Sequence, residues 1–245
     1  MKVVSIASSS KGNAYVVEHD GAAILIDCGV AYKNFKNFSI DAILITHSHT
    51  DHVQGLKTFL KYRDVPIYAN SMTAETIVVD EKVDPEAFVC FENGQEFEIG
   101  PFTVHPFSIP HDSSDPVGYQ IKVRDSHGDV VTYFHATDVG TPLDSIGRYL
   151  AEADIATIES NHDPVMLRTS KRPFCLIQRI AGPRGHLANE DAADLVKRFA
   201  SPRLKTLNLA HLSEACNTPD LAEETMRAAL KAIAREDVEL KVFSP

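Results

Sequence analysis

The 245-residue sequence contains no tryptophan and only four cysteines. The cysteines, at positions 28, 90, 175 and 216, form no CxxC pair, so we expect reduced thiols rather than disulfides or a thiolate zinc site. No stretch approaches the ~20 consecutive apolar residues of a membrane span. The apolar run after Met1 is too short for the core of a secretory signal. The sequence therefore predicts a cytoplasmic protein with no membrane partner.

Positive charge is also scarce, because 24 Lys and Arg face 34 Asp and Glu, for a net charge of −10. Such a balance argues against a protein that coats polyanions nonspecifically. The distribution is uneven, however. Residues 164–189 contain no acid but five cations: Arg168, Lys171, Arg172, Arg179 and Arg184. This window is either a solvated cationic face or a phosphate-binding strip, and its position directly before His186 favours the strip.

Short β-branched runs separated by turn residues dominate the first half of the chain, and strands alternate with helices in the second half. We expect strands over 3–7, 14–18, 22–27, 42–46, 67–69, 96–99, 102–108, 117–123, 130–134, 155–158, 206–210 and 238–242. Helices are expected over 54–62, 73–79, 142–151, 173–180, 190–199 and 221–234, with Asn189 capping the fifth. This order predicts an α/β (α+β) fold, a four-layer αββα sandwich. No linker is visible, so 1–245 is expected to form a single domain.

The most informative motif is His47-Ser48-His49-Thr50-Asp51-His52, directly after the apolar run 42–45. Three imidazoles and one carboxylate within six residues are costly to desolvate together unless a cation binds them. The pattern therefore predicts a metal-binding loop at the end of a strand.

Further polar residues stand where other apolar strands end. They are Asp27, His111, Asp138, Glu159 and His211. Taken singly, each is more often a structural residue, but together they supply the carboxylate and imidazoles that a two-metal centre needs. Mixed histidine and carboxylate ligation without thiolate suits zinc or manganese, with iron as an alternative.

In chain order these residues match the metallo-β-lactamase-fold hydrolases, and the sequence most closely resembles the YycJ/WalJ group, which is related to ribonuclease Z and the β-CASP nucleases. The finer matches are Ser9-Ser10-Lys11-Gly12-Asn13, Asp27-Cys28-Gly29, His111–Tyr119, Thr137-Asp138-Val139-Gly140, Glu159-Ser160-Asn161-His162-Asp163, Gly185–Glu190 and His211-Leu212-Ser213-Glu214. The interval between Asp138 and His186 is too short for an inserted β-CASP domain.

The resemblance implies a role for each matching residue. His47, His49 and His111 would hold one ion, Asp51, His52 and His211 a second ion, and Asp138 would bridge the two. Asp27 would orient the histidine loop. Glu159 and His186 resemble residues that assist proton transfer together with Asp51. Candidate substrate-binding residues are Arg179, Arg184, Ser213, Asn161 and Asn217. His162 is open between a supporting and a substrate-contacting role.

The resulting hypothesis is a metal-dependent hydrolase of ester bonds: a phosphodiesterase or exonuclease-like nuclease acting on DNA, RNA or another phosphodiester. A hydroxide shared by two divalent ions would attack phosphorus in line. His186, oriented by Glu159, would protonate the leaving oxygen. Two alternatives stay open. One is a small-molecule hydrolase, such as a cyclic phosphodiesterase or lactonase, and the other is a non-catalytic, metal-stabilised regulatory protein.

Overall fold

The computed structural model describes residues 1–243 and divides the chain into two compact units. Unit one comprises 1–108 and 113–131, and unit two comprises 109–112 and 132–245. Within the described residues, no helix combines the length and apolar character needed to cross a membrane. The division falls between the two halves that the sequence pattern indicates, while the expectation of one domain stays a prediction.

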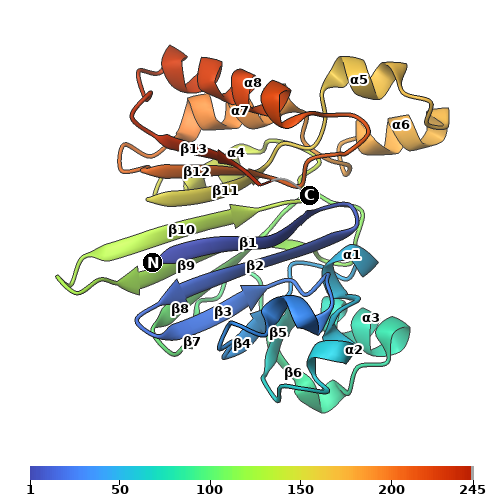
Figure 1. Cartoon of the computed structure of the whole chain (residues 1–245), viewed down its shortest axis with the longest axis vertical. Helices are drawn as coiled ribbons and strands as arrows, with labels where there is room; N and C mark the ends of the chain where they lie inside the picture. Colours follow the sequence, from blue (N-terminus) through green and yellow to red (C-terminus); the bar gives the residue numbers. More distant parts are fainter. Residues whose placement is uncertain (244–245) are drawn as a thin grey trace. The chain divides into compact units, whose positions relative to one another are not determined.

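Unit one contains a six-stranded sheet in the order β1 to β6 and a separate antiparallel ladder of β7, β8 and β9 (Figure 1). In the six-stranded sheet, β1 to β3 are antiparallel and β3 to β6 are parallel. The strands are β1 Lys2–Ser9, β2 Gly12–His19, β3 Ala22–Ile26, β4 Ala42–Leu44, β5 Ile67–Asn70, β6 Phe88–Phe91, β7 Phe97–Ile99, β8 Phe102–Ser108 and β9 Val117–Arg124.

Three helices and two 3-10 turns complete unit one: α1 Thr50–Val53, α2 Leu56–Phe59, α3 Ser71–Glu81, η1 Tyr32–Phe35 and η2 Pro85–Ala87. Val53 of α1 and Phe59 of α2 are buried in the same apolar cluster as Ile43 of β4 and Ile67 of β5. Burying a side chain of this size contributes about 1.5–3 kcal/mol. The cluster therefore anchors the helix that follows the histidine loop to the central strands of the sheet.

Unit two contains four parallel strands in the order β10 to β13, with helices α7 and α8 over one face of β11 to β13 (Figure 1). Parallel strands covered by helices are largely buried, and four of the five residues in each of Ile155–Glu159 and Thr206–Ala210 are buried. The elements are β10 Val130–Ala136, α4 Asp144–Leu150, β11 Ile155–Glu159, α5 Pro164–Thr169, α6 Phe174–Ile180, α7 Asn189–Phe199, β12 Thr206–Ala210, α8 Pro219–Ala232 and β13 Glu239–Val242.

The expected helix over 54–62 is shorter in the structure, where α2 covers only Leu56–Phe59 and Gly55 separates it from α1. The amide of Gly55 donates to the carbonyl of Cys28 at 2.8 Å, outside the helical ladder. A Cβ at this position would lie 2.1 Å from the carbonyl oxygen of Val30. The interruption is therefore a close backbone approach between distant segments, which sequence periodicity does not encode.

The sequence pattern missed β6 and α5, and it assigned the wrong cap to α7. The N-cap of α7 is Ala188, and Asn189 is its first helical residue. Instead of capping, the Asn189 carboxamide oxygen accepts a hydrogen bond from Ser160 Oγ at 2.7 Å. The Asn189 side chain thus bonds Ser160, a residue distant in sequence, in place of the backbone amide that an Asn N-cap would bond.

Candidate metal centre

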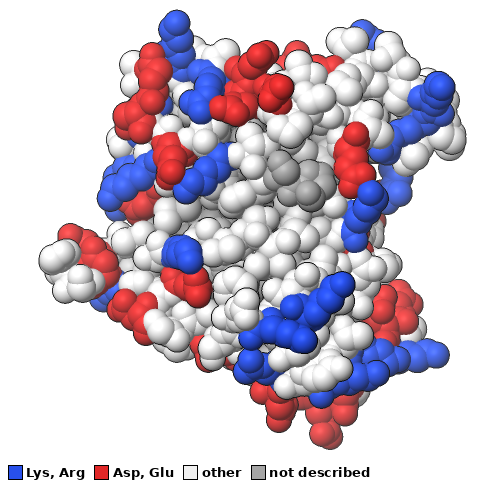
Figure 2. Space-filling model, in the orientation of Figure 1, with Lys and Arg blue, Asp and Glu red and all other residues white. Residues whose placement is uncertain are grey.

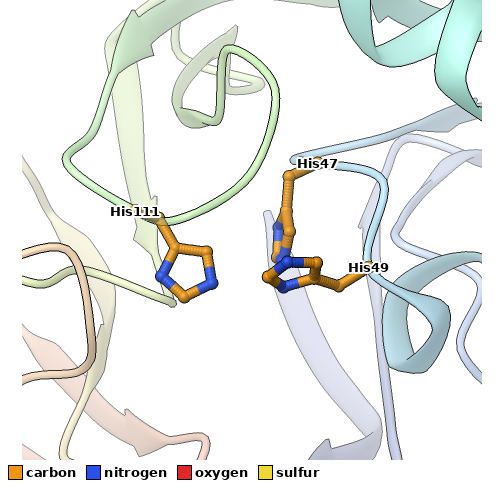
Figure 3. A group of neighbouring side chains, drawn as sticks. All are labelled: His47, His49 and His111. Atoms are coloured by element: carbon orange, nitrogen blue, oxygen red, sulfur yellow. The ribbon is translucent and has the colours of Figure 1, made fainter. Parts of the chain in front are cut away.

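The histidine motif occupies the end of the loop that follows β4 and the first three residues of α1, in unit one. His47 and His52 are completely buried, and their ring centroids are 4.0 Å apart. The His47 and His49 centroids are 4.7 Å apart. Figure 3 shows these last two rings on the loop, and separately the ring of His111 on its own segment. The motif therefore places three imidazoles, each a potential metal ligand, close together.

Asp27 fixes the orientation of the histidine loop from β3. Its side chain is completely buried and accepts hydrogen bonds from the Thr46 backbone amide at 2.9 Å and from His52 Nδ1 at 2.7 Å. The Thr46 hydroxyl donates to Asp27 Oδ2 at 2.8 Å, so the same hydroxyl oxygen accepts from His47 Nδ1 at 3.0 Å. One carboxylate therefore sets two imidazoles, directly and through a threonine.

Asp51 is positioned by Asn13, which lies at the start of β2. The Asn13 amide donates to Asp51 Oδ2 at 3.1 Å and to the Ser9 carbonyl at 3.0 Å. Close backbone packing adds to this support, because a Cβ on Gly29 would lie 1.8 Å from the Asp51 carbonyl oxygen. The loop of Ser9 to Asn13 thus has a structural purpose that its motif alone did not reveal.

His111 belongs to the short segment 109–112 of unit two, which follows β8. His111 Nδ1 donates to the Gly185 carbonyl at 3.0 Å, and Arg184 Nε donates to the His111 carbonyl at 3.0 Å. Burial lowers the pKa of His111 despite the nearby carboxylate of Asp138. The ring is therefore held as a neutral imidazole by the loop that also carries His186.

Three residues of unit two gather around Glu159: two follow the ends of β10 and β12, and the third lies on the loop before α7. Asp138, Glu159, His186 and His211 each offer a ligand atom, and these atoms lie within 4.8 Å of one another. Glu159 Oε1 accepts from Nδ1 of both His186 and His211 at 2.8 Å. Its Oε2 accepts the backbone amides of Val139 and Leu187 at 2.9 Å. Glu159 is completely buried and holds two histidines rather than facing solvent.

The charges of this cluster stabilise each other. Burial alone would raise the pKa of Glu159, but the positive charge of His186 and the two histidine hydrogen bonds hold it at about 2. Burial conversely lowers the pKa of His186, and the Glu159 carboxylate reverses this effect and raises it above 6.5. The pair is an ion pair when His186 is protonated, and the His186 side chain keeps 21% of its surface exposed.

Three of the candidate site residues adopt the left-handed backbone conformation just after a strand. Asp27, Asp138 and His211 have φ angles of 60°, 59° and 56°. Non-glycine residues occupy this region at a cost of about 1–3 kcal/mol each, and such strain clusters at functional sites. The conformation turns the chain sharply, which directs each side chain away from the strand that precedes it.

The donor chemistry fits a divalent cation. In His47, His52, His111 and His211 the Nδ1 atom is occupied by an oxygen acceptor: Thr46 Oγ1, Asp27, the Gly185 carbonyl and Glu159, respectively. A donated Nδ1–H leaves Nε2 as the ligating nitrogen, which is the usual arrangement around metal-binding histidines. The hydrogen bonds therefore hold these histidines in the form that can bind a divalent metal ion.

The predicted substrate residues are mostly engaged in internal contacts. The Asn161 amide donates to the His211 carbonyl at 2.8 Å, and the Asn217 amide donates to the Ser160 carbonyl at 2.9 Å. Arg179 pairs with Asp112, and Ser213 Oγ lies 3.4 Å from an Arg172 nitrogen. These contacts support the His111 and His211 segments, and substrate binding by these residues stays a prediction.

His162, at the end of the Glu159 segment, is 97% buried, with a relative exposure of 3%. Its Nδ1 has no hydrogen-bond partner within the described part of the chain. Burial lowers its pKa. The ring is therefore a buried neutral imidazole in the wall of the Glu159 cluster.

Sequence reasoning missed three supporting positions: Asn13, Thr46 and Gly185. Asn13 and Gly185 stood inside matched motifs but had no assigned role of their own, while Thr46 was predicted only as the end of a strand. One sequence feature could have indicated them: each lies in or next to a loop, and Thr46 and Gly185 directly precede the candidate site residues His47 and His186. Their partners, however, lie far away in sequence and are visible only in the fold.

Comparison with known families identifies the class of protein. Residues 23–207 match the family described as the Beta-lactamase superfamily domain, and the chain belongs to this superfamily. The metallo-β-lactamase-fold protein YhfI from Bacillus subtilis superposes with a TM-score of 0.73, covering 98% of this chain and 95% of that protein at 18% identity. The fold class expected from the sequence is thereby confirmed, and membership of this fold family implies the use of divalent metal.

Closer relatives narrow the family. The sequence is 32% identical to the exodeoxyribonuclease WalJ of Streptococcus pneumoniae serotype 2, covering 97% of this chain and 91% of that protein. It is 31% identical to the exodeoxyribonuclease YycJ of Bacillus anthracis, covering 92% of this chain and 88% of that protein. The chain belongs to the family of these proteins, so the resemblance found in the motifs is confirmed.

Proposed function

We propose that this protein is a metal-dependent exonuclease that hydrolyses phosphodiester bonds in nucleic acid. The observation that carries the proposal is the tethering of five histidines of the candidate site through Nδ1, as in His52 to Asp27 and His211 to Glu159. The relatives WalJ and YycJ, both called exodeoxyribonucleases, support a nuclease-like hydrolase and favour DNA as the substrate.

The proposed metal ligands are those expected from the sequence. One ion would be held by three histidines, a second by a carboxylate and two histidines, and Asp138 would bridge. In order, the two sets are His47, His49 and His111, then Asp51, His52 and His211. Two ions are part of the proposal, as is their identity as zinc or manganese, with iron as the alternative.

A bound divalent ion supplies a Lewis acid and lowers the pKa of coordinated water to about 7. The residues of the chain have the remaining tasks. Asn13 holds the Asp51 carboxylate. Glu159 holds His186 by Nδ1, so Nε2 of His186 is the atom that would deliver a proton to the leaving oxygen. Because both carboxylate oxygens of Glu159 accept only from internal donors, its role is to position His186 and His211.

A substrate panel tests the proposal directly. Purified protein loaded with zinc or manganese would be assayed on end-labelled single- and double-stranded DNA, on RNA, and on bis(p-nitrophenyl) phosphate. We expect stepwise release of nucleotides from DNA and its loss in Asp138→Asn and His186→Gln. A fully loaded wild type that releases nothing from any polynucleotide would refute the nuclease. Turnover of the small diester alone would instead favour a small-molecule phosphodiesterase.

The two variants separate metal binding from proton transfer. Asp138→Asn should lower bound metal, measured by elemental analysis of protein after gel filtration. His186→Gln should keep the metal and lower kcat by about 10²–10⁴-fold, the usual contribution of a general acid. If His186→Gln hydrolyses the bis(p-nitrophenyl) diester as fast as the wild type does, the result would support this role, because that leaving group needs no proton.

A further inference from the structure

The two short helices α5 and α6 form a hairpin inserted between two residues of the Glu159 cluster. Asp163 caps α5 through its side chain, accepting the Met166 amide at 2.7 Å, and its own amide donates to the Cys216 carbonyl at 2.9 Å. At the other end, the His186 amide donates to the Ile180 carbonyl at 2.9 Å. The hairpin is thus fixed at its base to the segments that carry Glu159 and His186.

The inner side of the hairpin is a small apolar cluster, in which Leu167 and Ile180 are buried with Cys216. Its outer side exposes Phe174 at 75% and Val165 at 55%. Phe174 has the highest exposed fraction among the large hydrophobic side chains of the described residues. An aromatic ring this exposed at the first position of a helix contributes little to packing among residues 1–243.

Two cations that precede Phe174 in the sequence likewise lack partners among the described residues. Arg168 and Lys171 are exposed, and across the 243 residues described neither has a hydrogen-bond or ion-pair partner. Elsewhere in unit two, two exposed arginines do have acidic partners: Arg198 pairs with Asp144 and Arg227 pairs with Glu223. Figure 2 shows Lys and Arg side chains gathered over α5 and α6.

We propose that the α5–α6 hairpin is an arm that binds the single-stranded end of a nucleic acid, with one base stacked on Phe174 and backbone phosphates on Arg168 and Lys171. This inference rests on the proposed nuclease function and names the surface that holds the substrate. Exposed aromatics beside cations are the recurrent platform for single strands, because every base has a face to stack and every linkage a negative charge. Window 164–189 has five cations and no acid in a chain of net charge −10, which suits a polyanion.

The test uses Phe174→Ala and the double variant Arg168→Gln/Lys171→Gln. Val79→Ala, which removes a side chain 72% exposed on α3, is the matched control for the first. Lys197→Gln/Lys231→Gln, which removes two exposed cations from α7 and α8, is the control for the second. All chains are measured in EDTA by fluorescence anisotropy with a labelled oligothymidylate of about 20 nucleotides.

We expect Phe174→Ala to weaken binding about tenfold, the usual loss for one stacked base. The double charge variant should weaken binding and lower the slope of log K against log salt by about 0.7 for each phosphate that is no longer neutralised. Both controls should bind like the wild type, and all variants should hydrolyse bis(p-nitrophenyl) phosphate at the wild-type rate.

Unchanged oligonucleotide binding in both arm variants, or no binding by the wild type, would overturn the proposal that the hairpin binds nucleic acid. If wild type binds but never cuts DNA, the nuclease proposal fails while the arm stands. If Phe174→Ala leaves oligonucleotide binding intact but abolishes self-association in sedimentation velocity, the hairpin is a contact between copies of this chain and the inference is wrong.

Discussion

The Nδ1 atom of His52 lies 2.7 Å from Oδ2 of Asp27, and both side chains are completely buried. The two residues are 25 positions apart: Asp27 directly follows β3, and His52 lies in α1. An imidazole held in this way keeps Nε2 unprotonated, and its basicity as a ligand increases.

Asp27→Asn should therefore weaken metal binding about 10–100-fold, because the carboxamide no longer accepts reliably from His52 Nδ1. The measurement is a competition titration of zinc against a chromophoric chelator. Asp41→Asn is the control, since Asp41 Oδ2 accepts the Ala23 amide at 2.8 Å in the same sheet but touches no candidate ligand. Equal zinc affinity in Asp27→Asn and wild type would contradict the assigned role.

Glu159→Gln tests the buried carboxylate that holds two histidines. In this variant a neutral carboxamide replaces the carboxylate that accepts from both His186 and His211. Because a buried charge pair is thereby broken, we expect the free energy of unfolding of the metal-free protein to fall by about 3 kcal/mol. Urea denaturation in EDTA measures the change. The exposed Glu190→Gln on α7 serves as reference, and a loss equal to that of Glu190→Gln would show that Glu159 does not organise the cluster.

Gly185→Ala tests the loop that bonds His111. A Cβ at this position would lie 2.2 Å from the Ile180 carbonyl oxygen, so the backbone must shift, at a cost of about 1–3 kcal/mol. The neighbouring Gly182→Ala, whose Cβ would lie 3.0 Å from the Gln178 carbonyl oxygen, should cost less. Thermal unfolding ranks the two, and a larger effect at Gly182 would argue against the close packing of Gly185.

The buried neutral ring of His162 predicts a pH dependence of stability. Burial lowers its pKa below the ordinary 6.5, so between these two values the unfolded chain binds more protons than the folded chain. The free energy of unfolding therefore falls as the pH drops below about 6.5.

His162→Gln removes this contribution, so stability should decrease less between pH 7.5 and pH 5.5 than in the wild type, about the range in which an ordinary histidine titrates. Urea denaturation at several pH values measures the difference. The exposed His127→Gln should follow the wild type. An unchanged pH profile in His162→Gln would mean that the ring is protonated in the folded protein.

Local patterns in the sequence were enough to establish the fold family and the identity of the candidate ligands. Apolar runs ended by Asp27, His111, Asp138 and His211 are such patterns, and the motif at 47–52 contains its own chemistry within one loop. Strand periodicity is also local, so most element positions were predicted. The break at Gly55 and the short helix α5 were not, because their causes are backbone packing and a brief capped turn.

How the side chains are held depends on the three-dimensional fold. The pairs Asp27 with His52, Asn13 with Asp51 and Glu159 with His211 join residues separated by 25, 38 and 52 positions. Hydrogen bonding depends on distance and angle in space, and the left-handed turns at the strand ends set both. Sequence supplies the ligand types, whereas the fold supplies the acceptors that occupy Nδ1 of each tethered histidine and leave Nε2 as its other ring nitrogen.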